Sequence, residues 1–229
     1  MTDRELSVVV VCAGVSTPSS TRLLAERIGH AVGDRLRVRD VGLDLRFIDV
    51  REIARDVTAA VVNVGRRSSA LEQANAAIAG ADAVVAVTPV FAGSYSGLFK
   101  SFFDVLDPEV LRRTPVLIAA TGGSERHSLM LDHAMRPLFT YFGALVLATG
   151  VFASTSDFGA TTSVGGGLSG RIDRAADELS QALGSALIPI PGDTSNSRTK
   201  RSADDLSAAE TAEAAGELPD FAALLRPGT

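Results

Sequence analysis

Hydroxyl side chains gather in one short stretch near the N-terminus, VCAGVSTPSSTRLL at residues 11–24. An apolar run stops there, and Gly14 is followed by serines, threonines, a proline and Arg22 before an apolar pattern of helical spacing begins. Unpaired amides and the helix dipole favour an anion at a helix N-terminus. The stretch lacks the Gly-Lys-Ser/Thr of a P-loop and the second glycine of the dinucleotide fingerprint. It therefore predicts either a plain helix cap, with Ser19 or Ser20 at the N-cap, or a site for a terminal monophosphate.

Two further loops combine small, polar and aromatic residues. TPVFAGSYSG (88–97) sets Phe91 and Tyr95 among glycine and hydroxyl residues, which suits either a planar ligand or an ordinary connection with an aromatic packed on the core. ATGGSERH (120–127) has two consecutive glycines, which let the backbone approach a ligand closely. It ends at His127. A lone histidine is more often structural or exposed than catalytic, but its position after a strand makes His127 a candidate site residue.

Five apolar runs alternate with amphipathic patterns along the chain. The predicted strands are 6–11, 45–50, 83–90, 114–121 and 144–153, and the predicted helices are 20–32, 51–63, 68–81, 96–107, 127–143 and 168–188. This alternation predicts an α/β fold with a doubly wound, five-stranded parallel sheet and helices on both faces. Ligands of such sheets bind beyond the carboxyl ends of the strands. The three loops follow the first, third and fourth strands. Pro137 should kink or interrupt its helix.

Composition narrows the class of protein. The 229 residues, 46% of them hydrophobic, suffice for one sizeable core. A formal net charge of -5, with no basic stripe, argues against nucleic acid as a partner. No apolar run reaches the length of a membrane span. The single cysteine, Cys12, excludes a disulfide framework within the chain and a cysteine-based metal cluster, and no metal site is expected. MTDREL does not have the pattern of a signal peptide, and with one cysteine the chain is predicted to be cytoplasmic.

The composition changes after residue 190. Residues 191–229 are mostly small, polar and charged, as in a flexible tail. Their last part, LPDFAALLRPGT, contains a candidate short docking helix near 219–225. The sequence thus predicts one domain at 1–190 followed by a tail at 191–229.

The three loops together resemble a known family. GVSTPSST, TPVFAGSYSGLFKSFFD and ATGGSERHSLMLDHAMRPLF are similar, in this order, to motifs of the NAD(P)H-dependent FMN reductases of the flavodoxin-like fold. The likeness spans about residues 5–188 and is greatest to the reductases that partner luciferase-like, two-component flavin monooxygenases. It implies a flavodoxin-like sheet, FMN with NADPH or NADH, and hydride transfer from NAD(P)H to FMN, with reduced flavin passing to a partner monooxygenase. It also implies a homodimer or homotetramer, whose interface the helices at 97–107 and 127–143 could supply.

The resemblance assigns the cofactor site to the three loops. For the FMN phosphate it implies Ser16, Ser19, Ser20, Thr21 and Arg22. For the flavin ring it implies Pro89, Val90, Phe91, Ser94, Tyr95 and Ser96. For the polar edge of the ring it implies Thr121, Gly122, Gly123, Ser124 and His127. The expected role of His127 is to stabilise the negative charge of the reduced flavin.

The sequence departs from the family pattern in its first loop. Many members carry an arginine where this chain has Thr17 and Pro18, so the phosphate charge is left to amides, the helix dipole and Arg22. The two-component reductases also have an extra residue in the helix after the third loop, seen as a π-bulge at a subunit interface. His133 is the candidate for that residue.

Two other functions stay open at this point. An NAD(P)H:quinone or azo reductase would retain its FMN. A flavodoxin-type electron carrier, or a non-catalytic flavin-binding protein, would not oxidise NAD(P)H. Carriers of that type usually hold the flavin between a tryptophan and a tyrosine, and this chain has no tryptophan and two tyrosines. The choice between NADH and NADPH is open as well.

Overall fold

The chain contains a doubly wound sheet. A computed structural model describes residues 5–63, 67–158 and 167–186, which lie within one unit, Met1–Ile190. The strands are β1 (Leu6–Cys12), β2 (Leu43–Asp49), β3 (Ala83–Phe91), β4 (Ser94–Tyr95), β5 (Pro115–Gly122), β6 (Leu145–Val146) and β7 (Val151–Ser154). The main order is β2-β1-β3-β5-β6, and every pairing along it is parallel. Without the two-residue β4 this is the 2-1-3-4-5 order of the flavodoxin-like fold. The predicted tail, with its candidate helix at 219–225, lies outside the described residues.

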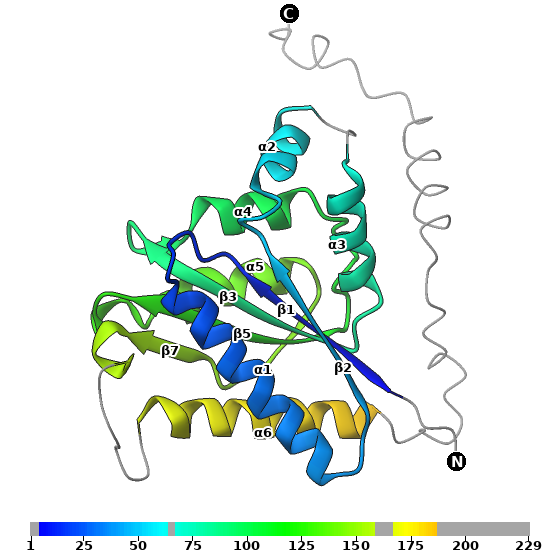
Figure 1. Ribbon diagram of the computed structural model, residues 1–229, viewed down its shortest axis with the longest axis vertical. Helices are drawn as coiled ribbons and strands as arrows, with labels where there is room; N and C mark the ends of the chain where they lie inside the picture. The colour runs from blue at the N-terminus through cyan, green and yellow to red at the C-terminus, as the bar shows by residue number, and fades with distance from the viewer. Residues whose placement is uncertain (1–4, 64–66, 159–166, 187–229) are drawn as a thin grey trace, which may run out of the picture. The chain divides into compact units, whose positions relative to one another are not determined.

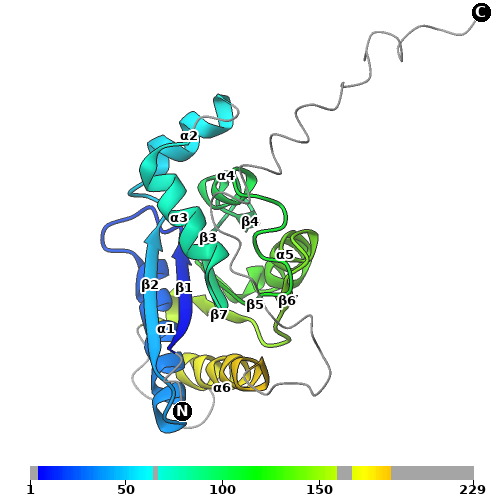
Figure 2. The same cartoon turned by 90° about the vertical axis from the view of Figure 1, so that its right-hand side faces the viewer.

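Helices cover both faces of the sheet (Figures 1 and 2). They are α1 (Ser20–Val38), α2 (Ala54–Val62), α3 (Ser69–Ala79), α4 (Gly97–Asp104), α5 (Arg136–Tyr141) and α6 (Leu168–Ala186). Side chains alternate across a strand, so Val8 and Val10 of β1 pack with the apolar residues of α1 and α6. Val9 and Val11 pack with those of α2 to α5 on the other face. The continuous apolar sequence of β1 therefore reflects burial on both sides.

The predicted fifth strand is wrong as a single element. The sheet has seven strands rather than five. Two short strands occupy the predicted fifth position, where β6 pairs with the start of β5 and β7 with its end, and the two-residue β4, in a segment predicted as a loop, pairs with β3. Between them, the Glu178 carboxylate accepts the N–H groups of Ala148 and Thr149 at 2.8 and 2.9 Å. Arg136 donates to the carbonyls of Leu147 and Ala148 at 2.8 and 3.2 Å. These side chains satisfy backbone groups that a neighbouring strand would otherwise pair.

The helix predicted over 127–143 is divided into three parts. A 3₁₀ turn (Glu125–His127) is followed by a π-helix (Leu131–Met135) and then by α5. The N–H of Arg136 donates to the carbonyl of Leu131, five residues back, as a π-helix requires. His133 lies in this π-helix, which confirms that the helix contains an extra residue there. Pro137 falls in the first turn of α5, where its missing N–H is tolerated.

A partly buried carboxylate ties the end of β7 to α6. Asp157, in the 3₁₀ turn Thr155–Phe158, accepts the N–H and the hydroxyl of Ser154, both at 2.8 Å, and an Arg171 N–H at 2.6 Å. Burial by itself raises the pKa of Asp157. The hydrogen bonds from Ser154 and Arg171 outweigh burial and leave the pKa below its ordinary value.

Replacing Asp157 with Asn should lower the free energy of unfolding by about 1–3 kcal/mol at pH 7, because an amide cannot accept all three bonds or balance Arg171. A carboxylate whose pKa is depressed by folding stabilises fully above its ordinary pKa of 3.8 and less as pH falls through the lower folded value. Urea unfolding at several pH values should therefore show the gap between parent and variant shrinking below about pH 4. Asp173→Asn, at a more exposed ion pair with Arg35, should cost less than about 1 kcal/mol. A pH-independent gap for Asp157→Asn would contradict the assignment.

Candidate functional site

The three loops meet at one edge of the sheet. β1, β3 and β5 are neighbours, with Cys12 opposite Val87 and Pro89 opposite Thr121 in the register. Parallel strands end at the same edge, so the segments 13–21, 89–96 and 121–127 lie side by side. We call this region the site edge.

The first loop, residues 13–19, is called the hydroxyl loop. Ser19 is the N-cap of α1: its hydroxyl accepts the N–H of Arg22 at 3.1 Å and its carbonyl accepts that of Leu23 at 3.0 Å. The N–H groups of Ser20 and Thr21 have no acceptor among the described residues. The side chains of Ser16 and Ser20 are exposed beside them. The predicted helix cap is therefore present at Ser19. It leaves the N–H groups of Ser20 and Thr21 and the neighbouring hydroxyls available for an anion.

Two threonine hydroxyls join the start of α1 to the end of β5. Thr21 Oγ1 and Thr121 Oγ1 lie 2.7 Å apart, and both side chains are buried. The resemblance implies that each contacts FMN, but the structure pairs the two hydroxyls with each other. Their evident role is to hold the hydroxyl loop against the third loop.

The second loop is a tight β-hairpin. β3 and β4 pair antiparallel, with Phe91 opposite Ser94 and Val90 opposite Tyr95. Ala92 and Gly93 form its turn, both with positive φ, which matches the right-handed twist of the strands. Phe91 at the tip is 49% exposed. The centroid of the Tyr95 ring instead lies 5.9 Å from that of Phe99, and the partly buried Tyr95 packs against the core, so the two aromatics expected to face the ligand have different environments.

Ser96 and Thr88 fix the end of this loop. The Ser96 hydroxyl is buried and caps α4 by accepting the N–H of Phe99 at 3.2 Å, so it is committed to the helix rather than open to a ligand. The N–H of Ser96 donates to Thr88 Oγ1 at 3.1 Å, and that hydroxyl donates to the carbonyl of Pro89 at 3.0 Å. Thr88 was not among the residues predicted for the site from the sequence. The only feature that could have indicated its role is a threonine directly before Pro89 at the end of a buried strand.

The glycines of the third loop serve different purposes. A Cβ on Gly122 would lie 2.8 Å from Cζ of the buried Phe152, so packing requires glycine there. A Cβ on Gly123 would meet no described atom within 4 Å, and the residue is exposed. Ser124 accepts the N–H of Arg126 at 3.3 Å, and His127 is exposed at the end of the 3₁₀ turn. Gly123 and His127 are thus the open positions of this loop.

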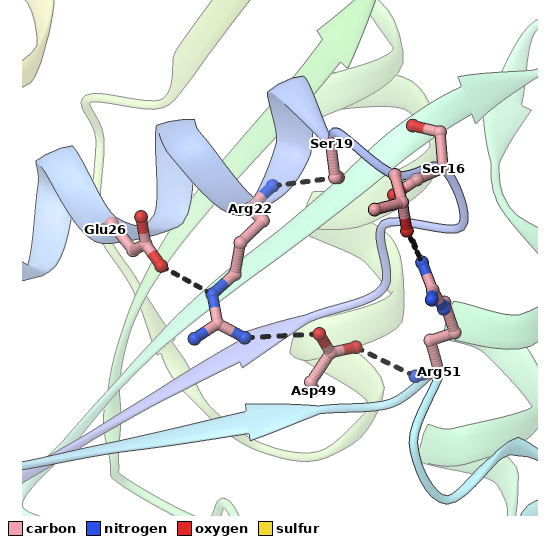
Figure 3. Close-up of polar contacts among 7 residues, drawn as sticks. Ser16, Ser19, Arg22, Glu26, Asp49 and Arg51 are labelled. Carbon is pink, nitrogen blue, oxygen red and sulfur yellow. Dashed lines mark hydrogen bonds and ion pairs between the residues drawn. The ribbon is translucent and has the colours of Figure 1, made fainter.

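Arg22 does not point into the hydroxyl loop. Its Nε donates to Glu26 at 2.7 Å and its Nη1 to Asp49 at 3.2 Å (Figure 3). Its guanidinium carbon also lies 5.6 Å from the centroid of the Phe47 ring. The expected phosphate role of Arg22 is therefore not supported, because two carboxylates already hold its charge. The i,i+4 spacing from Arg22 to Glu26 was a sequence signal for this pairing.

Arg51 contacts the hydroxyl loop instead. It follows β2 directly, and its Nη1 donates to the Ser16 carbonyl at 3.2 Å and to Thr17 Oγ1 at 2.5 Å. The sequence reading missed it. The available signal was a cation immediately after a strand whose carboxyl end lies at the same edge as that of β1.

Other groups add no chemistry to the site edge. Cys12 is buried, and burial raises the pKa of its thiol to about 11, so it is not a thiolate at neutral pH. Within the ranges given above, no three His, Cys, Asp or Glu side chains form a set that could hold a metal ion. No helix in those ranges is both long and apolar enough to cross a membrane.

Fold and site edge together define a flavodoxin-like protein suited to a flavin nucleotide. Unpaired amides, hydroxyls and Arg51 fit a terminal phosphate, and Phe91 and Gly123 are exposed at the edge where ligands of this fold bind. Residues 6–159 match the family model described as NADPH-dependent FMN reductase, and the chain belongs to this family. It is an oxidoreductase that uses NAD(P)H to reduce FMN, as the sequence resemblance implied.

Individual relatives agree with the family match. The NADH-dependent FMN reductase SfnF of Pseudomonas fluorescens is 38% identical over 192 residues, which are 82% of this chain and 97% of the relative. The FMN reductase (NADPH) of Pseudomonas aeruginosa is 38% identical over 185 residues, 80% of this chain and 96% of the relative. An oxidoreductase structure from Corynebacterium diphtheriae is 42% identical with a TM-score of 0.75, covering 79% of this chain and 98% of that one.

Proposed function

We propose that FMN binds at the site edge, with its phosphate on the hydroxyl loop and its ring between the second and third loops, and that the reduced FMN passes to a partner flavin-dependent monooxygenase. The observation that carries the site is the pair of N–H groups on Ser20 and Thr21 that lack an acceptor among the described residues, beside the exposed Ser16 hydroxyl. When bound, FMN accepts a hydride from the nicotinamide nucleotide.

The chain then needs to bind and orient rather than to supply an acid or base. Amides of Ser20 and Thr21, with the hydroxyls of the loop, would hold the phosphate. Phe91 is exposed where it can cover one side of the ring. Backbone N–H groups around Gly123 would meet the carbonyl edge of the flavin, and His127 would stabilise negative charge there.

The environment of the aromatic side chains supports release of FMN rather than retention. Tyr95 is partly buried, and its ring packs against Phe99 at the surface of the core. Phe91 is then the one exposed aromatic in the described segments of the site edge. Stacking on one side holds a flavin less strongly than a two-sided sandwich, which fits a reductase that hands on its product. The relatives' names include both NADH and NADPH, so each nucleotide is a candidate donor for this chain.

One titration tests the proposal: FMN, FAD and riboflavin against NADH and NADPH, with turnover and flavin release followed together. We expect protein purified without flavin, and NAD(P)H oxidation with FMN preferred to riboflavin. Tightly retained flavin with ping-pong reduction of quinones or azo dyes would favour the quinone reductase alternative. FMN-loaded protein that does not oxidise either nucleotide would favour an electron carrier. In the same titration, unchanged FMN binding and reduction by His127→Ala would remove the role of that residue.

The homodimer or homotetramer stays a prediction. The structure reduces the two helices expected to form the contact between copies to one candidate. The phenylalanines of α4 fill the chain's own core, so they are not available to a second copy. Leu129, Tyr141 and Leu145, along the segment that contains the π-helix, are 62%, 75% and 56% exposed. This segment, rather than α4, is the better candidate for a contact between copies.

A further inference from the structure

Two guanidinium groups lie near the hydroxyl loop, and they differ in their partners (Figure 3). Arg22 is paired with Glu26 at 2.7 Å and with Asp49 at 3.2 Å. Arg51 directs its side chain to Ser16 and Thr17, and no carboxylate among the described residues lies within salt-bridge distance of it. An ion-paired guanidinium attracts an incoming anion less than one whose charge is not neutralised.

Asp49 binds the two arginines in different ways: it binds the side chain of Arg22 but only the backbone of Arg51. One of its oxygens accepts Arg22 Nη1, and the other accepts the backbone N–H of Arg51 at 3.1 Å. The first bond holds the Arg22 side chain beside β2. The second fixes the turn after β2, from which the side chain of Arg51 reaches the hydroxyl loop.

The guanidinium of Arg51 can both hold the loop and bind a ligand. A guanidinium has five N–H donors in a fixed plane, and the two contacts to the loop use Nη1 alone. The Nε and Nη2 donors have no acceptor among the described residues. They therefore remain available, on an exposed side chain, next to the hydroxyls of the loop.

We propose that Arg51 is the cationic group of the phosphate subsite: it positions the hydroxyl loop and selects the phosphorylated flavin over riboflavin. The inference rests on the proposed FMN site and adds to it a residue outside the three loops. Arg51 belongs to the β2–α2 connection and is brought to the loop by the parallel pairing of β1 and β2.

The test is the affinity of the full chain for FMN and for riboflavin, measured by quenching of flavin fluorescence at low and high salt. Arg51→Gln should raise the Kd for FMN about tenfold, as expected for loss of one charge-assisted contact at a partly exposed site. The Kd for riboflavin should change less than about twofold, because riboflavin has no phosphate. The salt dependence of FMN binding should fall in the same variant. Arg51→Lys, which keeps the charge, should recover part of the preference for FMN.

Two matched variants serve as controls. Arg55→Gln removes the same charge from an exposed arginine of α2, and Arg22→Gln removes the ion-paired arginine. Neither should change the ratio of the two Kd values by more than about twofold. Thermal unfolding of each variant separates loss of binding from loss of folding.

Several results would overturn the inference. Equal losses for FMN and riboflavin in Arg51→Gln would leave Arg51 with a structural role only. An unchanged Kd for FMN in Arg51→Gln would mean that Arg51 has no role in flavin binding. If Arg22→Gln changed the ratio of the two Kd values more than Arg51→Gln did, Arg22 would be the phosphate-binding cation. These outcomes all presuppose a parent chain that prefers FMN. A parent that binds both flavins equally would overturn the proposed phosphate site itself, together with the inference.

Discussion

Gly14→Ala should weaken FMN binding by about 30-fold, or ~2 kcal/mol. A Cβ at residue 14 would lie 2.2 Å from Ser19 Oγ and 3.2 Å from Cβ of Thr21. The Ser19 hydroxyl cannot move without giving up the N-cap bond to Arg22, which costs about 1 kcal/mol. Thr21 cannot move without disturbing its buried contact with Thr121. The hydroxyl loop must therefore change its conformation to admit one methyl group.

Gly33→Ala is the matched control for Gly14→Ala. It adds the same methyl group within α1, where the nearest atom would be Cδ2 of Leu43 at an ordinary 3.4 Å. Alanine favours a helix interior over glycine by up to about 1 kcal/mol, so this variant should keep its FMN affinity and unfold at equal or higher urea concentration. Flavin fluorescence titration and urea unfolding measure both. If Gly14→Ala bound FMN as the parent does, the hydroxyl loop would not be the phosphate subsite.

Phe103→Ala should lower the free energy of unfolding by about 3–5 kcal/mol, the usual cost of removing a buried aromatic ring. Phe103 is fully buried in α4. Its ring centroid lies 4.8 Å from that of Phe99, 5.3 Å from Phe102, 5.0 Å from Phe139 and 6.1 Å from Phe142. It thus joins α4 to α5 and the residue that follows α5. Truncation leaves a cavity among rings whose own backbones hold them in place, so the site cannot readily close.

Tyr141→Ala provides the comparison for Phe103→Ala. Its ring is 75% exposed at the end of α5, so its removal should change the free energy of unfolding of a single chain by less than about 0.5 kcal/mol. Urea unfolding followed by circular dichroism gives both values. A loss below about 1 kcal/mol for Phe103→Ala would mean that the aromatic cluster repacks, contrary to the geometry described.

Several elements could be predicted because they depend on local chemistry. The β-branched runs predicted β1, β3 and β5 within one or two residues. Ser96 was expected at the start of its helix and Ser19 was one of two candidate N-caps, with Ser20, because the need of a helix for an N-terminal acceptor is local. An interruption around Pro137 was also predicted from a local property, the missing N–H of proline, and the structure places Pro137 in the first turn of α5, directly after the π-helix. Helix ends were less accurate: α1 continues to Val38, beyond the predicted end at 32.

The division of the fifth strand could not be predicted in this way. ALVLATGVFA has the composition of one strand, but Glu178 and Arg136 take over backbone groups in its middle. Neither side chain is adjacent in the sequence to the segment it binds. Their effect depends on how α5 and α6 pack against the sheet. The same reason explains why Thr21 and Thr121, both expected at the ligand, are paired with each other.

The sequence alone determined the class of this protein: the alternation of strands and helices, the three loops at strand ends, and the resemblance to FMN reductases. Only the tertiary structure decided which cation meets the hydroxyl loop. Arg22 lies in the sequence of the first loop, but its neighbours at the i+4 position and on β2 bind it. Arg51 is 35 residues from Ser16. It reaches the loop because β1 and β2 pair in parallel, so that their carboxyl ends lie at the same edge. Hydrogen bonds between strands bring together residues that are far apart in the sequence.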